Sequence, residues 1–152
     1  MKKQRKTTTK KKTSTKRSLG KYKSGLELDS AKLLRESGLE FDYEGIEYVL
    51  VDGFKYDGVY HKMTPKGKQM TDKSLKSVFP IKYTPDFVAK DGSWIIETKG
   101  FNRSHHDFPM RWKLFLKFLS DKGGELPMLF ICKNKSQVED AIQIIKANGK
   151  RP

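Results

Sequence analysis

Apolar residues along the first third of the chain follow first a helical spacing and then a strand-like one. Residues 24–38 place leucines at helical spacing, and Ser24 and Gly38 are of the residue types that begin and end helices. Residues 39–51 are rich in aromatic and β-branched side chains, which favour a strand, with Gly45 as a bulge. The pattern therefore predicts a helix followed directly by a strand.

Two turn dipeptides divide the middle of the chain. Asp57-Gly58 lies within FKYDGVYHK and predicts a hairpin. Residues 61–79 are polar and lysine-rich and have little pattern, so we expect an excursion from the sheet that is either functional or mobile. Asp91-Gly92 separates the strand-like runs YTPDFVA and SWIIETKG, which predict a second hairpin over residues 81–99.

The last third of the chain predicts helix, strand and helix. A helix over residues 104–120 has an apolar stripe formed by Phe108, Trp112, Phe115 and Leu119. The apolar run PMLFICK favours a strand inside a mixed sheet. A final helix over residues 136–148 is expected to open with a capping box from Ser136 to Glu139. Strand, helix and strand in this order predict a right-handed parallel crossover, so the fold class is α/β, or α+β with a mixed sheet.

Charge is distributed unevenly over the 152 residues. The chain has 32 Lys and Arg against 18 Asp and Glu, a net charge of +14. Residues 1–23 hold 11 of the basic residues and no acid, which leaves 21 basic and 18 acidic residues, a net of +3, for residues 24–152. We expect residues 1–23 to be a disordered basic arm before a single domain over 24–152 with a polar insertion at about 52–79. Such an arm favours phosphate partners, and a solubilising leader is the alternative.

Composition also excludes several classes of protein. Cys132 is the one cysteine, so the chain forms no internal disulfide and no cysteine-rich zinc site, and we expect a core thiol in a reducing cytoplasm. No apolar stretch approaches the roughly 20 residues that cross a bilayer. No apolar segment of a signal peptide follows the basic run. We therefore expect a cytoplasmic protein without a membrane partner.

Charged residues in the hairpin over 81–99 are the strongest indication of chemistry. The period of two along a strand places Glu97 and Lys99 on one face, roughly 6–7 Å apart, and Asp86 lies on the neighbouring strand opposite the end of IIETK. Two carboxylates and one ammonium would then converge, which suits Mg²⁺, with Mn²⁺ as a substitute. An exposed cross-strand salt bridge is the alternative. The flanking apolar runs argue against it, because they predict buried positions where unpaired charge is costly.

Three other acids have competing interpretations. Glu27 fits a capping box with Ser24, which is a structural role, yet it also falls within the apolar arc of its helix, where a carboxylate needs a partner. The sequence leaves these two roles open. Asp42 and Glu44 alternate with aromatic residues, which favours the solvated face of a half-buried strand.

Several basic residues are candidates for nucleic-acid contact, although most such residues are merely solvated. They are Lys21 and Lys23 at the end of the basic arm, and Arg103, Arg111 and Lys113 around the second helix. His105 and His106 precede that helix without any matched ligand spacing, so we interpret them as exposed residues at its start.

Four short segments in this order, SGLE, FDYE, YTPDF and ETKG, resemble the phage endonuclease I family of Holliday-junction resolvases. They also resemble the wider PD-(D/E)xK nuclease superfamily, whose restriction-endonuclease-like core runs helix, three strands, helix and strand. The resemblance covers roughly residues 22–48 and 81–101, and beyond residue 101 only the order of elements supports it.

The resemblance implies a metal-dependent endodeoxyribonuclease that cuts branched DNA in the cytoplasm of a phage-infected host. It implies that Asp86, Glu97 and the carbonyl of Thr98 bind Mg²⁺, that Lys99 orients or deprotonates the attacking water, and that Glu27 completes the site. Asp42 stands where the family tends to have a glutamate. The family forms a homodimer with exchanged strands, and the longer segment between FDYE and YTPDF puts that homodimer in question.

Other function classes are compatible with the same sequence. A basic nucleic-acid-binding protein with this fold and no metal is the main rival, and a general or nicking DNase without junction preference would have nearly the same sequence pattern. A structural phage protein or a ribosome-associated protein would explain the basic arm but not Asp86, Glu97 and Lys99. Mg²⁺-dependent cleavage separates the enzymes from the binding proteins.

Overall fold

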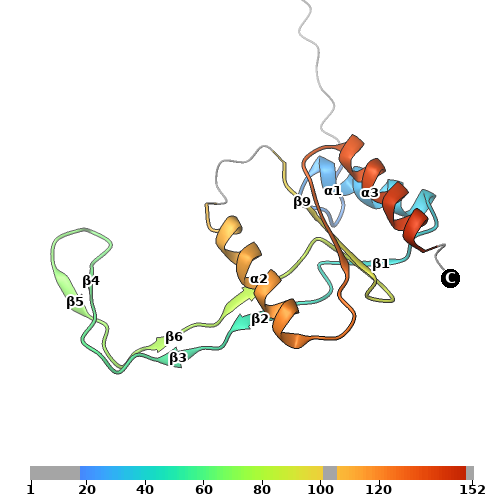
Figure 1. Ribbon diagram of the computed structural model, residues 1–152. Helices are drawn as coiled ribbons and strands as arrows, with labels where there is room; N and C mark the ends of the chain where they lie inside the picture. The colour runs from blue at the N-terminus through green and yellow to red at the C-terminus, as the bar shows by residue number, and fades with distance from the viewer. Residues whose placement is uncertain (1–17, 101–105, 150–152) are drawn as a thin grey trace, which may run out of the picture.

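A four-stranded sheet with helices on both faces forms the body of the protein (Figure 1). The computed structural model describes residues 18–100 and 106–149. The strand order is β1-β8-β9-β10, with bounds Phe41–Tyr43, Phe87–Ala89, Trp94–Thr98 and Met128–Cys132. β1, β8 and β9 pair antiparallel, and β10 pairs parallel with β9. The sheet is therefore mixed, which confirms the predicted α/β or α+β class and the parallel pairing across the second helix.

The three helices cover opposite faces of this sheet. α1 (Gly25–Glu36) and α3 (Lys135–Asn148) pack on one face around Trp94 and Ile96 of β9, whereas α2 (Phe108–Lys122) packs on the other face around Ile95. Because side chains alternate along a strand, β9 supplies both cores and is buried along its whole length. β9 is therefore the strand that both cores share.

The predicted start and end of α1 are confirmed. The Ser24 side chain accepts a hydrogen bond from the Glu27 backbone N–H, as an N-cap does. Gly38, with φ +73°, follows the last turn, and the next N–H, of Leu39, donates to the Leu34 carbonyl. Tyr22 is also buried in the core, so ordered structure begins before Ser24. Residues 1–17 of the expected basic arm lie outside the described residues.

The single strand predicted over residues 39–51 is wrong. The chain forms β1 in the main sheet and then β2 (Tyr48–Val51), which pairs with β7 (Ile81–Tyr83) instead. The break occurs at Glu44, which has φ +46° and donates its N–H to the Asp86 carbonyl. Gly45 is not a bulge. A Cβ at Gly45 would lie 2.9 Å from the Asp42 Cβ, so glycine permits a close approach at this bend.

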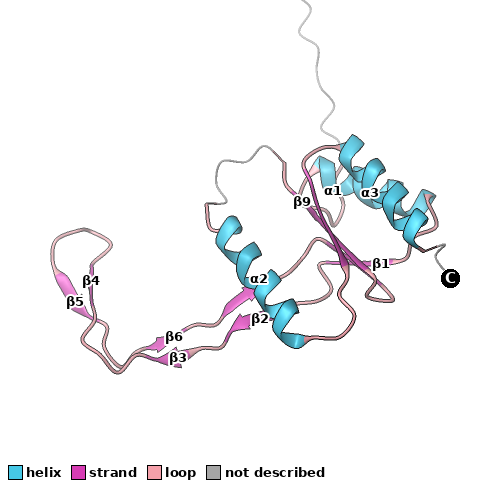
Figure 2. Ribbon diagram, in the orientation of Figure 1, coloured by secondary structure: helices cyan, strands magenta, loops and turns pink. Residues whose placement is uncertain are grey.

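A long antiparallel ribbon projects from the body beyond β2 and β7 (Figure 2). β3 (Phe54–Lys55) pairs with β6 (Ser77–Val78), and β4 (His61–Met63) pairs with β5 (Met70–Asp72). We call residues 52–80 the β-ribbon arm. The excursion expected over residues 61–79 is thus the distal hairpin and the returning half of the arm.

The hairpin turn predicted at Asp57-Gly58 is wrong. The chain reverses at residues 64–67, where the Gly67 N–H donates to the Thr64 carbonyl at 2.8 Å and Gly67 has φ +64°. Gly58 serves a different purpose, because a Cβ there would lie 2.5 Å from the hydroxyl oxygen of Tyr56. The absence of a side chain at Gly58 lets the Tyr56 ring fold over the backbone.

Two later predictions also need correction. β10 lies at the edge of the sheet and not in its interior, since its only partner in the described sheet is β9. The helices cover the faces of the sheet but not this edge, and Ile131 is accordingly exposed. The N-cap of α3 is Asn134 instead of Ser136, because the Asn134 side chain accepts from the Gln137 N–H at 3.0 Å.

Two further predictions for this half of the chain, the apolar stripe of the second helix and the buried thiol, are confirmed. The apolar stripe of α2 is confirmed, with Phe115 and Leu119 buried, although the helix begins at Phe108 and Ser104 lies outside the described residues. Cys132 is a buried thiol at the end of β10, and burial raises its pKa to about 11. No helix within residues 18–100 and 106–149 is both long and apolar enough to span a bilayer.

Candidate active site

Asp86 lies at the entry to the β8–β9 hairpin, directly across from the end of β9. The hairpin turns at Gly92, with φ +75°, as its sequence predicts. Its register pairs Phe87 with Ile96, which places Asp86 beside the last residues of β9. Thr98 donates both its backbone N–H, at 2.7 Å, and its hydroxyl, at 2.5 Å, to the Asp86 Oδ2 atom. The predicted position of Asp86 opposite IIETK is confirmed.

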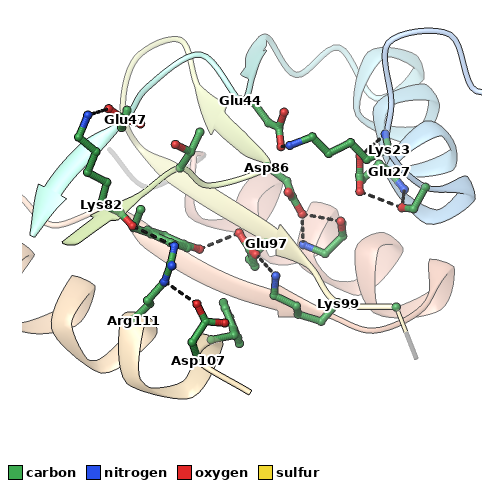
Figure 3. A pocket seen from close by; sticks show the side chains of 16 residues that line it. Lys23, Glu27, Glu44, Glu47, Lys82, Asp86, Glu97, Lys99, Asp107 and Arg111 are labelled. Carbon is green, nitrogen blue, oxygen red and sulfur yellow. Dashed lines mark hydrogen bonds and ion pairs between the residues drawn. The ribbon is translucent and has the colours of Figure 1, made fainter. Parts of the chain in front are cut away.

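Glu97 and Lys99 share a face of β9, as the period of two predicts. The Lys99 Nζ atom lies 2.5 Å from the Glu97 Oε1 atom, and the Tyr83 hydroxyl donates to Oε2 at 2.6 Å. Lys99 Nζ also lies 4.2 Å from the centroid of the Phe108 ring. Figure 3 shows Asp86, Glu97 and Lys99 converging at one end of the hairpin. Glu97 is 2% exposed and Asp86 is 9% exposed, so this is not an exposed salt bridge.

The site carries more negative charge than its surroundings stabilise. Burial and then the charge of Glu97 raise the pKa of Asp86 to about 7, and Glu27 adds to this, although the hydrogen bonds from Thr98 act in the opposite direction. Burial and the charge of Glu97 also raise the pKa of Tyr83, so its hydroxyl keeps its proton and remains a donor. A bound cation would relieve this repulsion between carboxylates.

Glu27 has the structural role that its sequence predicts, and its buried carboxylate also finds hydrogen-bond partners. Its carboxylate accepts from the Lys23 backbone N–H at 2.8 Å, from the Ser24 hydroxyl at 2.9 Å and from the Tyr43 hydroxyl at 2.5 Å. These bonds tie the chain before α1 to its first turn. Glu27 also lines the same pocket as Asp86 and Glu97. The helix cap and the pocket therefore share one carboxylate, and the buried position explains its place in the apolar arc.

These groups line a pocket of about 510 Å³, the size of an ordinary ligand site. Its walls come from the start of α1, the chain after β1, the end of β7 and the residues that follow it, the end of β9 and the first turn of α2. The charged residues in its lining are Lys23, Glu27, Glu44, Glu47, Lys82, Asp86, Glu97, Lys99, Asp107 and Arg111. Glu27, Asp86 and Glu97 are buried inside the pocket, whereas Glu47, Asp107 and Arg111 are exposed at its rim (Figure 3).

The structure brings some of the predicted DNA-contact residues to this pocket and leaves others away from it. Lys23 pairs with Glu44 at the rim, and Arg111 pairs with Asp107 at 2.8 Å. Lys21 is exposed nearby, with Nζ 5.8 Å from the centroid of the Tyr43 ring. Lys113 is exposed on α2 and does not line the pocket. Arg103 and His105 lie outside the described residues, and His106 is exposed as expected.

The two acids assigned to a solvated face have different outcomes. Asp42 pairs with Lys90 at 2.5 Å and is well exposed, which confirms that interpretation. For Glu44 the interpretation is wrong, because Glu44 is half-buried and lines the pocket. The positive φ of Glu44 turns the chain out of β1 and toward the site.

Sequence reasoning missed three hydroxyl groups that organise the carboxylates. They belong to Tyr43, Tyr83 and Thr98, which donate to Glu27, Glu97 and Asp86 respectively. The Tyr43–Glu27 and Tyr83–Glu97 pairs form only when separate elements pack together, whereas Thr98 and Asp86 meet across one hairpin. The sequence offered one signal for these hydroxyls: Tyr83 stands next to the acidic motif TPDF.

Carboxylate oxygens, which Asp86 and Glu97 supply, are the type of donor that Mg²⁺ takes in proteins. No group of three or more His, Cys, Asp or Glu residues is placed to share an ion within residues 18–100 and 106–149. Asp86 and Glu97 nevertheless supply two carboxylates whose charges repel each other. Mg²⁺ commonly takes one or two carboxylates and completes its octahedron with waters and substrate oxygens. Two buried carboxylates are therefore sufficient for such a site.

Comparison with other proteins adds no assignment to this geometry. No family model matches the chain, and no curated protein or solved structure matches it either. The functional conclusion rests on the site itself.

Proposed function

We propose that this chain is a metal-dependent endodeoxyribonuclease with a PD-(D/E)xK-type core, acting on branched DNA such as Holliday junctions. One observation carries the proposal: Asp86 and Glu97 are buried at the end of the central hairpin, and the half-buried Lys99 pairs with Glu97 there. Two carboxylates and an ammonium in this arrangement suit the hydrolysis of a phosphodiester, whose transition state gathers negative charge. A purely structural role does not explain why a fold would bury two mutually repelling carboxylates.

Each residue of the site has a distinct part in the proposed reaction. Mg²⁺ bound by Asp86, Glu97 and the Thr98 carbonyl would offset the charge of the phosphate and acidify a bound water. Lys99 is held against Glu97 and the Phe108 ring, where its ammonium can hydrogen-bond to the attacking water or to a phosphoryl oxygen. Tyr83 fixes the orientation of Glu97. The expected products carry 5′-phosphate and 3′-hydroxyl ends.

The basic rim of the pocket supplies the contacts to the DNA backbone. Lys23 and Arg111 flank the carboxylates, and Lys21 is exposed beside them. Their present partners, Glu44 and Asp107, are acids at the same rim. Exposed ion pairs of this kind contribute little stability, so phosphates can replace these partners at low cost. These contacts position DNA without reading its sequence.

Cleavage by point variants tests the proposal. We expect Glu97→Gln and Lys99→Met each to lose at least about a hundredfold in Mg²⁺-dependent cleavage of a four-way junction, while junction binding in EDTA is retained. Asp42→Asn is the matched control, because Asp42 is an acid on the same sheet that does not line the pocket. Undiminished cleavage by both site variants would exclude this site. Linear duplex, flap and single-stranded DNA measure substrate preference in parallel.

A metal-free nucleic-acid-binding protein is the second candidate. It is favoured by the hydrogen bonds already present, because Thr98, Tyr83 and Lys99 satisfy the carboxylates without any ion. Metal response distinguishes the two functions. The nuclease is expected to show a higher melting temperature in Mg²⁺ or Mn²⁺ than in EDTA, and a binding protein is expected to show no such shift and no nicking of supercoiled DNA.

A further inference from the structure

The β-ribbon arm exposes far more apolar surface than a solvated hairpin requires. Phe79 is 85% exposed and Val59 is 81% exposed. Phe54, Tyr60, Met63, Met70 and Leu75 are exposed as well. None of these residues belongs to either core cluster of the described chain. Apolar side chains gathered in this way mark a binding surface, because water alone is a poor environment for them.

The same arm is basic. Residues 52–80 contain six lysines (Lys55, Lys62, Lys66, Lys68, Lys73 and Lys76) and three aspartates (Asp52, Asp57 and Asp72), a net charge of +3. None of the six lysines belongs to an ion pair among the described residues. If two copies of the arm paired with each other, their lysines would repel. A polyanion would instead neutralise the charge of the lysines and so remove their repulsion.

Strand β7, which directly follows the arm and which we call its root, is part of the candidate active site. Tyr83, at the end of β7, donates to Glu97, and the Lys82 carbonyl accepts a hydrogen bond from Arg111 at 3.3 Å. From Val51 to Thr64, where the turn begins, an extended strand at about 3.3 Å per residue reaches at most about 43 Å. One turn of duplex DNA spans roughly 34–36 Å. DNA held at the carboxylates can therefore also meet the arm.

From these features we propose that the β-ribbon arm is the element that recognises branched DNA, which rests on the proposed nuclease function. The arm's lysines contact phosphates of the arms of the junction. Its exposed aromatic side chains, Phe54, Tyr60 and Phe79, stack on bases at the branch point. Bases within a regular duplex hide their faces in the stack, but bases at a branch point can unstack and expose them to aromatic side chains. The combination of lysine and aromatic residues therefore favours branched over linear DNA.

Binding measured without cleavage tests this proposal independently of catalysis. In EDTA, we expect Phe79→Ala and Tyr60→Ala each to lose about tenfold in affinity for a four-way junction and less than about threefold for a linear duplex of equal length. A 2-aminopurine at the branch point should be quenched by the full chain and less so by these variants. The matched controls are Leu126→Ala and Ile144→Ala, which truncate exposed apolar residues on the body.

Each outcome separates the inference from the nuclease function. If the full chain binds junctions through the arm but shows no Mg²⁺-dependent cleavage, the inference stands and the nuclease function fails. If the chain cleaves DNA but the arm variants keep their junction preference and the quenching, the arm inference is wrong. A third outcome would also overturn it: if sedimentation shows a dimer that Phe79→Ala dissociates with junction preference unchanged, the arm binds a second copy of this chain.

Discussion

At the scale of single residues, Asp86 shows most directly how the fold prepares its chemistry. A carboxylate ordinarily titrates near 4, but burial and the neighbouring charge of Glu97 raise the pKa of Asp86 to about 7. Thr98 stabilises the ionised form with two hydrogen bonds and only partly offsets this effect. The protein keeps an unfavourable charge at a fixed position, which is the arrangement expected where a cation binds.

Asp86→Asn is predicted to stabilise the metal-free protein at alkaline pH. In EDTA the folded chain holds a proton on Asp86 up to about pH 7, whereas the unfolded chain releases it near pH 4, so stability declines as pH rises between these values. The cost at pH 8 is on the order of a few kcal/mol. Thermal melts at pH 5 and pH 8 should show a smaller decline for Asp86→Asn than for the full chain, and no response of the variant to Mg²⁺.

Asp42→Asn serves as the control for this prediction, because Asp42 is exposed and paired with Lys90. It should leave both the pH dependence and the Mg²⁺ response unchanged. A variant Asp86→Asn that is less stable than the full chain at pH 8 would contradict the prediction, because it would show that the ionised carboxylate is favourable in the folded state.

At the scale of elements, the body and the β-ribbon arm are stabilised by different interactions. β9 is buried by helices on both faces, and its side chains belong to two separate cores. The arm is held mainly by backbone hydrogen bonds and by a few local contacts, such as the one from the Tyr60 N–H to the Ser74 hydroxyl at 2.8 Å. Isolated two-stranded hairpins are only marginally stable in water. The arm therefore depends on its root and contributes little to the stability of the body.

Two phenylalanines allow this difference to be measured. Phe115→Ala removes a ring that is 0% exposed on the buried face of α2, and we expect a loss of about 3–5 kcal/mol in the free energy of unfolding. Phe79→Ala removes a ring that faces solvent, and we expect a change within about 0.5 kcal/mol. Urea unfolding of both variants checks the comparison. Similar losses for the two would mean that the arm is part of the cooperative core.

At the scale of the whole molecule, most of the positive charge and the acidic pocket lie in different parts of the chain. Residues 1–17 contain nine of the 32 Lys and Arg and no acid, so most of the net charge of +14 precedes the described fold. The acids of the proposed active site line the pocket, and under the proposed function the positive charge of the rest of the chain would draw DNA toward them. Binding strength and site chemistry are thereby located in separate parts of the chain.

Neutralising residues 1–17 is predicted to weaken DNA binding without changing the chemistry. Each phosphate contact contributes about 0.9 to the slope of log K against log salt for duplex DNA. Replacing the nine basic residues by glutamine keeps the length and should lower that slope by several units, while cleavage at saturating DNA stays within about threefold. Binding titrations between 50 and 200 mM salt provide the measurement. An unchanged slope would show that this segment makes no phosphate contacts.

Much of the local structure and part of the site followed from the sequence. The Ser24 cap, the Gly92 turn, the α2 stripe and the shared face of Glu97 and Lys99 all depend on residues close together in the chain. The true turn of the arm was also visible, because Thr-Pro-Lys-Gly at residues 64–67 combines proline and glycine at positions that a turn favours. The Asp57-Gly58 dipeptide is nevertheless the stronger local signal for a hairpin turn, so the local sequence favours the wrong position.

The sequence by itself determined the three helices, the hairpin of β8 and β9 and which of their residues share a face, because periodicity and capping act over a few residues. Only the tertiary structure decided that β10 lies at an edge, that β2 leaves the sheet, and that the hydroxyls of Tyr43 and Tyr83 hold the carboxylates. These outcomes depend on pairings between distant segments, such as Phe54 with Val78 in the arm. Burial, and with it the raised pKa of Asp86, exists only once those segments have packed together.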